Sequence, residues 1–166
     1  MISASADKTV AIWDAVTGTR MKKFVGHTGV VNSVCPNSSG SLSVVSGSDD
    51  GLVNVWDARS KFPTHTLEHD YPVTAVAYGQ DGVTVYSGNL DGSIKSWDLR
   101  MNEMTLEMKG HTDIITSLAL NPAGTHLMSN GMDSMICTWD IRAFVAGDIR
   151  RTGTYWGAKV RNLKCS

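Results

Sequence analysis

Short apolar stretches alternate with turn-forming segments along most of this chain. In one stretch of about forty residues the sequence predicts four strands, at Val30–Cys35, Leu42–Ser46, Leu52–Asp57 and Thr64–Leu67. Pro36–Gly40 and Asp50-Gly51 lie between them and have the composition of turns. Short strands bounded by such turns indicate an antiparallel sheet.

The same plan returns twice downstream. The second copy predicts strands at Val73–Ala77, Val83–Ser87 and Ser93–Asp98. The third predicts strands at Ile114–Leu120, His126–Ser129 and Ser134–Asp140. The chain is therefore expected to be all-β and built from repeated units.

Four residue types mark the repeat. Trp-Asp begins at Trp13, Trp56, Trp97 and Trp139, with spacings of 43, 41 and 42 residues. Six residues before each tryptophan stand Asp7, Asp50, Asp91 and Asp133. Four residues before each of these aspartates stand Ser3, Ser46, Ser87 and Ser129. The histidines are His27, His69 and His111; the first and third follow glycine, and His69 follows Glu68.

This register resembles the WD repeat, which has a Gly-His near its start, a Trp-Asp near its end and a period of about 40–45 residues. The resemblance implies a β-propeller of four-stranded blades. It also implies one buried hydrogen-bond network per blade. Its expected members are His27, Ser46, Asp50 and Trp56, then His69, Ser87, Asp91 and Trp97, then His111, Ser129, Asp133 and Trp139.

A structural role for these groups is favoured over catalysis. Ser, His and Asp also form hydrolase triads, but an enzyme needs one nucleophile and this set occurs three times. The sequence has no G-x-S-x-G, P-loop, G-x-G-x-x-G or H-E-x-x-H motif. Neither an enzymatic activity nor a cofactor nor a metal site is expected.

The propeller is expected to be incomplete, with about four blades of a probable seven. The first repeat starts at its second strand, and Leu163–Ser166 has the pattern of an inner strand whose blade has only begun. The Trp and the next inner strand are 17 residues apart at three junctions, but about 23 apart after Trp139. We therefore expect an insertion at Ala143–Gly157, with the missing histidine position near Lys159. The whole chain, 1–166, is read as one partial propeller.

Charge is uneven along the chain. Residues 1–141 hold 9 Lys/Arg and 15 Asp/Glu, a net charge of −6, whereas residues 142–166 hold 6 and 1, a net charge of +5. Tyr155 and Trp156 are the residues of the basic part that could offer bases a stacking surface. RNA contact through 142–166 is thus conceivable, but it is not expected to be primary. Three cysteines without metal or disulfide spacing favour a reducing compartment, nucleus or cytoplasm.

Segments around the markers resemble the WD-repeat proteins of the U5 small nuclear ribonucleoprotein. They include SASADKTVAIWDAVTGTRMKKFVGHTGVVNSV, GSIKSWDLRMNEMTLEMKGHTD and MSNGMDSMICTWDIRAF. The resemblance implies a nuclear component of the spliceosome that binds other splicing proteins. No membrane contact and no small-molecule substrate are implied.

A second reading rests on three W-D-x-R motifs, which end at Arg59, Arg100 and Arg142. They resemble the motif by which substrate receptors of cullin-four ubiquitin ligases meet an adaptor. The simpler explanation is that each arginine pairs locally with a nearby carboxylate.

Partner contacts are expected on loops at the ends of the propeller. The residue before the tight-turn aspartate and the residue two after the histidine vary between repeats. The candidates are Asp49, Tyr71, Leu90, Asp113 and Met132, with Tyr71 and Met132 favoured because aromatic and Met side chains are enriched at interfaces.

Overall fold

A computed structural model describes residues 1–40, 42–142 and 150–156 of the chain. The regular structure of these residues consists of strands that form four antiparallel sheets, one of three strands and three of four strands. Within each sheet, strands that follow one another in the sequence are paired, so every sheet is a meander. This confirms the predicted all-β blade architecture.

The bounds of the strands follow the repeat. The first sheet contains β1 (Ile2–Ala4), β2 (Thr9–Trp13) and β3 (Arg20–Val25). The second contains β4 (Val31–Pro36), β5 (Ser43–Ser48), β6 (Leu52–Asp57) and β7 (His65–Glu68). The third contains β8 (Val73–Tyr78), β9 (Thr84–Asn89), β10 (Ser93–Asp98) and β11 (Glu103–Lys109). The fourth contains β12 (Ile115–Leu120), β13 (His126–Gly131), β14 (Met135–Asp140) and β15 (Arg151–Trp156).

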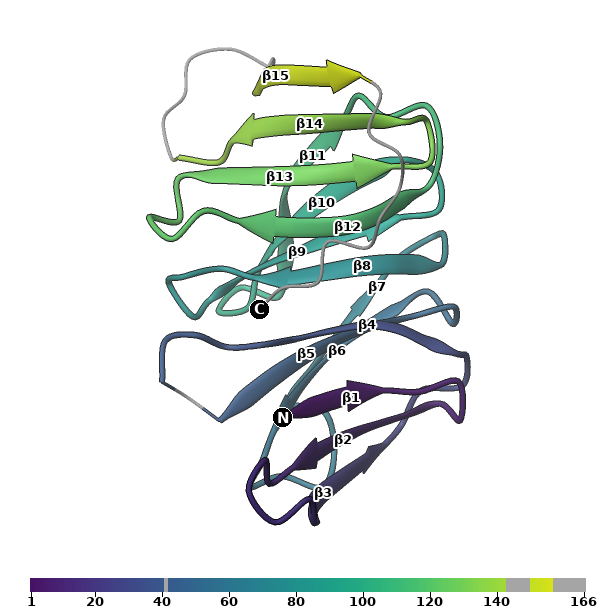
Figure 1. The fold of residues 1–166 in the computed structure, drawn as a ribbon, viewed down its shortest axis with the longest axis vertical. Helices are drawn as coiled ribbons and strands as arrows, with labels where there is room; N and C mark the ends of the chain where they lie inside the picture. Colours follow the sequence, from purple (N-terminus) through teal and green to yellow (C-terminus); the bar gives the residue numbers. More distant parts are fainter. Residues whose placement is uncertain (41, 143–149, 157–166) are drawn as a thin grey trace.

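The sheets, called blades one to four from here on, stack in sequence order along the long axis of the molecule (Figure 1). The first strand of each blade lies beside the first strand of the next. A groove of about 800 Å³ runs along these inner strands, and Ile2, Asn32, Val76 and Thr116 are among the residues that line it.

Apolar side chains fill the space between neighbouring blades. Val45 and Val53 of blade two pack against Val73, Val76 and other residues of blade three, and all of them are buried. Gly47 allows this close approach, since a Cβ atom there would lie 2.6 Å from Cγ1 of Val73. Each blade therefore buries its apolar face against its neighbour, as repeat architectures require.

A tight turn lies between the second and third strands of blades two to four and between β1 and β2 of blade one, and it defines the end of each blade called here the tight-turn end. Its third residue has positive φ: 76° at Gly51, 78° at Gly92, 69° at Lys8 and 62° at Ser134. The loop to the next blade lies at the same end, because the His69 N–H donates to the Gly51 carbonyl at 2.9 Å. Trp-Asp and the W-D-x-R arginines lie at the opposite end, called here the Trp-Asp end.

One expectation about the fourth blade needs correction. Residues Ala143–Gly157 were expected to be an insertion, but Arg151–Trp156 forms β15, the outer strand of this blade. Its hydrogen bonds to β14 complete the four-stranded blade, which alternation of apolar and polar residues did not reveal in RTGTYW. The expected inner strand at Leu163–Ser166 and the position near Lys159 lie outside the described residues.

Candidate functional site

The tetrad of blade two is a continuous hydrogen-bond chain. The indole N–H of Trp56 donates to Oγ of Ser46 at 2.8 Å, and this hydroxyl lies 2.7 Å from Nε2 of His27. Nδ1 of His27 lies 3.0 Å from Oδ2 of Asp50. The same carboxylate accepts the Thr28 N–H at 2.8 Å, so the network connects two strands, the tight turn and the loop from the previous blade.

Blade four repeats this geometry. Trp139 Nε1 lies 2.8 Å from Oγ of Ser129, Ser129 Oγ 2.7 Å from Nε2 of His111, and His111 Nδ1 2.9 Å from Oδ2 of Asp133. The backbone N–H of Thr112 donates to the same carboxylate at 3.0 Å. The two blades therefore use the same solution although their apolar residues differ.

Hydrogen bonding keeps both carboxyl groups ionised. Burial by itself would raise the pKa of Asp50, but the bonds from the Thr28 N–H, His27 and the Leu52 N–H together outweigh it and lower the pKa below its ordinary value. The pKa of Asp133 is lowered by an equivalent set of bonds against the same opposing effect of burial. A charged acceptor makes each of these bonds stronger than a neutral pair would be.

The buried hydroxyl groups of the tetrads are unsuited to attack a substrate. Ser46 and Ser129 are both 0% exposed, and each is held between an indole N–H and an imidazole. A nucleophile needs access to the reacting atom. The geometry thus fits a structural role for the Ser, His and Asp groups.

Blade three differs from expectation, because Asp91 and His69 are not joined. Nδ1 of His69 lies 3.2 Å from the Leu67 carbonyl, and its Nε2 lies 2.7 Å from Oγ of Ser87 and 3.1 Å from the indole nitrogen of Trp97. Asp91 instead accepts the backbone N–H and the hydroxyl of Ser93. The predicted four-membered network is wrong for this blade.

The physical reason lies in the residue before the histidine. A Cβ atom at Gly26 would lie 2.9 Å from Cη2 of Trp56, and one at Gly110 would lie 2.8 Å from Cη2 of Trp139. Blade three has Glu68 at this position, so its tryptophan cannot sit as deeply. Trp97 is half-buried, whereas Trp56 and Trp139 are 1% and 2% exposed.

Blade one holds the remaining predicted residues. The indole N–H of Trp13 donates to Oγ of Ser3 at 2.7 Å, as in blades two and four. Asp7 accepts from the backbone and hydroxyl of Thr9, and Nζ of Lys23 lies 3.6 Å from it. Asp7 is exposed and serves the tight turn.

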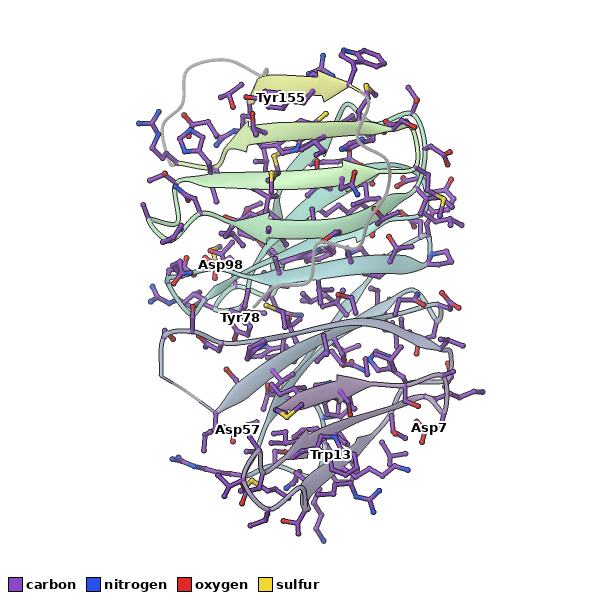
Figure 2. The ribbon with its side chains drawn as sticks, viewed as in Figure 1. Asp7, Trp13, Asp57, Tyr78, Asp98 and Tyr155 are labelled. Carbon is purple, nitrogen blue, oxygen red and sulfur yellow. The ribbon has the colours of Figure 1, made fainter. Side chains whose placement is uncertain are left out.

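The five loop candidates gather at the tight-turn end and are exposed; they are Asp49, Tyr71, Leu90, Asp113 and Met132. Backbone bonds place them there: the Asp49 N–H donates to Val30, the Leu90 N–H to Pro72 and the Met132 N–H to Ile114. In Figure 2, Asp7 marks this end of blade one, and Asp57 and Asp98 mark the opposite end. Tyr71, Leu90 and Met132 are 50%, 42% and 53% exposed, so their apolar side chains are accessible to a partner.

Val30, Glu68 and Asp70 are among the other exposed residues at this end that the sequence analysis did not identify. The carboxylates of Glu68 and Asp70, together with those of Asp49 and Asp113, give the tight-turn end an acidic rim. Asp70 pairs with Lys95 across 3.6 Å but remains largely exposed. The sequence signal that could have identified Glu68 and Asp70 is their charge in the loop before the third blade.

The W-D-x-R arginines lie at the Trp-Asp end. Arg142 is engaged locally: its Nε lies 3.0 Å from Oδ1 of Asp140, and its Nη2 contacts Oδ2. This pairing holds the pKa of Asp140 well below its usual range. Asp57 and Asp98 accept the backbone N–H groups of Arg59 and Arg100, and both arginines are exposed.

Within the described residues, no group of His, Cys, Asp and Glu has the arrangement of a metal site. Residues 1–40, 42–142 and 150–156 also contain no helix that could cross a membrane.

Comparison with known proteins identifies a family model and several relatives that match the repeats of this chain. The model of the WD domain, G-beta repeat, matches residues 18–57, 61–98 and 102–140. The chain is 48% identical over 114 residues to the pre-mRNA-splicing factor cwf17 of Schizosaccharomyces pombe, covering 69% of the chain and 34% of that protein. It is 46% identical over 107 residues to the human U5 small nuclear ribonucleoprotein 40 kDa protein, covering 64% and 30%.

The corresponding protein of Dictyostelium discoideum is 41% identical over 101 residues, which cover 61% of the chain and 28% of that protein. The chain spans about a third of the length of these relatives. The three matched ranges include the Trp-Asp pairs at Trp56, Trp97 and Trp139, which lie on the third strands of blades two, three and four. The expected resemblance is confirmed, and the chain belongs to the WD40 family of WD-domain, G-beta-repeat proteins.

Proposed function

We propose that this chain is part of a non-enzymatic protein-binding scaffold of the U5 small nuclear ribonucleoprotein, acting in pre-mRNA splicing in the nucleus. The observation that carries the proposal is its 41–48% identity to a pre-mRNA-splicing factor and to two 40 kDa proteins of the U5 small nuclear ribonucleoprotein. Blade architecture alone would not support it, because the same fold carries many functions.

The tight-turn end has the chemistry of a protein contact surface. Tyr71, Leu90 and Met132 present apolar area there, and Asp49 and Asp113 supply carboxylates at its rim. Apolar and aromatic residues inside a polar rim are typical of interfaces. The buried tetrads of blades two and four hold the tight turns in place, so the surface is preorganised for a partner.

The test is affinity purification of the tagged whole protein from cells, with splicing proteins and small nuclear RNA measured in the eluate. The double variant Tyr71→Ala/Met132→Ala should reduce recovery of directly bound splicing proteins by roughly tenfold, as expected when two anchors are truncated. Arg59→Ala/Arg100→Ala is the matched control, since it changes exposed residues at the opposite end and should leave recovery unchanged.

A different outcome would reverse the assignment. A cullin-ligase adaptor that dominates the eluate, and that Arg59→Ala/Arg100→Ala releases, would favour a substrate-receptor role. Recovery of neither class would reject the scaffold in splicing. Equal recovery with both double variants would leave splicing in place and reject the tight-turn end as the contact surface.

A further inference from the structure

The loop that enters blade three departs from the repeat in its charge. The loops before blades two and four have the sequence Gly-His-Thr around His27 and His111. The loop before blade three has Glu68-His69-Asp70 instead. Among these three loops, carboxylate side chains therefore flank the histidine in the loop of blade three alone.

Two carboxylates of blade three are also more exposed than their counterparts. In blades two and four the tetrad aspartate is half-buried and bonds to the histidine. Asp91 of blade three is exposed and accepts hydrogen bonds from Ser93 of its own turn. The Asp70 side chain is 86% exposed, although it lies 3.6 Å from Nζ of Lys95. Blade three thus exposes carboxylates at positions that are uncharged or half-buried in its neighbours.

Two apolar side chains lie among these carboxylates. Tyr71 is 50% exposed and Leu90 is 42% exposed. The Leu90 N–H donates to the Pro72 carbonyl at 3.0 Å, so the turn of blade three lies beside the loop that carries Tyr71. Blades two and four pack against blade three on its two sides (Figure 1). The exposure of Tyr71 and Leu90 is therefore a property of the tight-turn end and does not arise from an open face of the stack.

The neighbouring blades extend this surface on either side. A Cβ atom at Gly51 would lie 2.9 Å from the His69 carbonyl oxygen, so the turn of blade two, which carries exposed Asp49, touches the loop into blade three. A Cβ atom at Gly92 would lie 2.9 Å from the Asp113 carbonyl oxygen, so the turn of blade three touches the loop into blade four. Asp49 and Asp113 thus flank the part of the surface that blade three contributes.

The charge of this part of the chain is negative. Residues 68–113 hold eight Asp/Glu and three Lys/Arg, a net charge of −5. Of the three basic residues, Arg100 lies at the Trp-Asp end, and the Nζ atoms of Lys95 and Lys109 lie 3.6 and 3.1 Å from carboxylate oxygens. A surface of this sign repels polyanions and attracts cationic segments.

We propose that this surface binds a lysine- or arginine-bearing segment of a partner protein. One apolar side chain of the segment packs on Tyr71 and Leu90, the anchors of the surface, and its cations meet the surrounding carboxylates of Glu68 and Asp70. That the partner is a splicing protein rests on the proposed function, whereas its positive charge is argued from this surface alone.

The experiment measures binding of the purified whole protein to the fluorescent peptide KKKLKKK by anisotropy, at low and at physiological salt. Glu68→Lys reverses an exposed charge and should weaken binding at least about threefold at low salt, because like charges then face each other. The loss should shrink as salt rises, since exposed charges are screened. Tyr71→Ala should weaken binding of KKKLKKK more than that of KKKSKKK, which lacks the apolar side chain.

Glu103→Lys is the matched control, because Glu103 is an exposed glutamate at the start of β11, at the Trp-Asp end of blade three. It should leave the affinity unchanged, and the peptide EEELEEE should not bind. Thermal unfolding checks that each variant keeps its fold, and Glu68→Gln, which only removes the charge, replaces Glu68→Lys if that variant melts early. Absence of KKKLKKK binding, equal affinities of the Glu68 and Glu103 variants, or a loss that does not depend on salt would each overturn the proposal.

This result can be separated from the proposed function. KKKLKKK binding with the expected ranking of variants, but without splicing proteins in the affinity purification, would reject the role in splicing and keep the cationic ligand. Splicing proteins that co-purify equally with Glu68→Lys and Glu103→Lys at low salt would keep the role in splicing and overturn the cationic partner.

Discussion

The indole N–H of Trp97 donates directly to Nε2 of His69 at 3.1 Å, whereas in blades two and four the indole reaches a serine hydroxyl. This bond requires an unprotonated Nε2, because two N–H groups cannot share a hydrogen bond. Burial, with Lys95 nearby, lowers the pKa of His69 to about 4, although the Leu67 carbonyl favours the charged form. The blade with Glu68 before its histidine therefore depends on a neutral imidazole.

His69 should make stability fall in mild acid. Its pKa is about 4 when folded and about 6.5 when unfolded, so between these values the unfolded chain binds more protons. This contribution to stability is complete above pH 6.5 and is lost as the pH falls toward 4, by at most about 1.4 kcal/mol per pH unit.

Urea unfolding of the whole protein across this pH range measures the effect. His69→Gln should flatten the dependence even though it lowers stability overall. His65→Gln, which changes a histidine of β7 outside the networks, should keep it. The same pH dependence in His69→Gln and wild type would contradict the assignment.

Asp50→Ala should destabilise the protein more than Asp91→Ala. Asp50 satisfies a buried imidazole and the N–H groups of Thr28 and Leu52, whereas Asp91 bonds only within its own turn, to Ser93. Each buried group left without a partner costs about 1–3 kcal/mol. Thermal unfolding of both variants decides the order, and an equal loss of stability would mean that the His27 contact adds nothing.

Gly110→Ala should destabilise blade four. The new Cβ would lie 2.8 Å from Cη2 of Trp139 and 3.2 Å from Nη1 of Arg151, so a buried ring would have to move. Overpacking of this kind costs about 1–3 kcal/mol. Glu68→Ala at the matching position of blade three should be nearly neutral, since a side chain is already accommodated there. Chemical denaturation that ranks the two variants in reverse would refute the clash.

Thr74→Val should weaken the contact between blades three and four. The Thr74 hydroxyl lies within hydrogen-bond distance of the Ile115 carbonyl in the next blade and of the Gly88 carbonyl in its own. Thr116→Val is the control, because its hydroxyl bonds to Asn130 of the same blade. We expect a loss of about 1 kcal/mol for the first variant beyond the second, read from hydrogen exchange of β12 amides. Equal protection in both would contradict a role between blades.

The sequence by itself determined the repeat, the fold class and most strand positions. Trp-Asp spacing, turn composition and alternating apolar residues are local properties, and each blade must solve the same packing problem. Leu52–Asp57 and Ser93–Asp98 were placed with their observed bounds. The tetrads of blades two and four were implied by the resemblance to WD repeats, and both blades have glycine before the histidine, Gly26 and Gly110.

Tertiary structure alone decided where the repeat fails. Glu68 puts a Cβ atom before the histidine of blade three, whereas a Cβ at Gly26 or Gly110 would lie 2.9 or 2.8 Å from the tryptophan ring of its blade. In this blade the hydroxyl of Ser93 donates a hydrogen bond to the carboxylate of Asp91. Likewise, β15 was invisible in RTGTYW because its strand character comes from pairing with β14, a contact made across the blade. Non-local contacts of this kind override local pattern, since a few hydrogen bonds and one side-chain volume outweigh weak strand propensities.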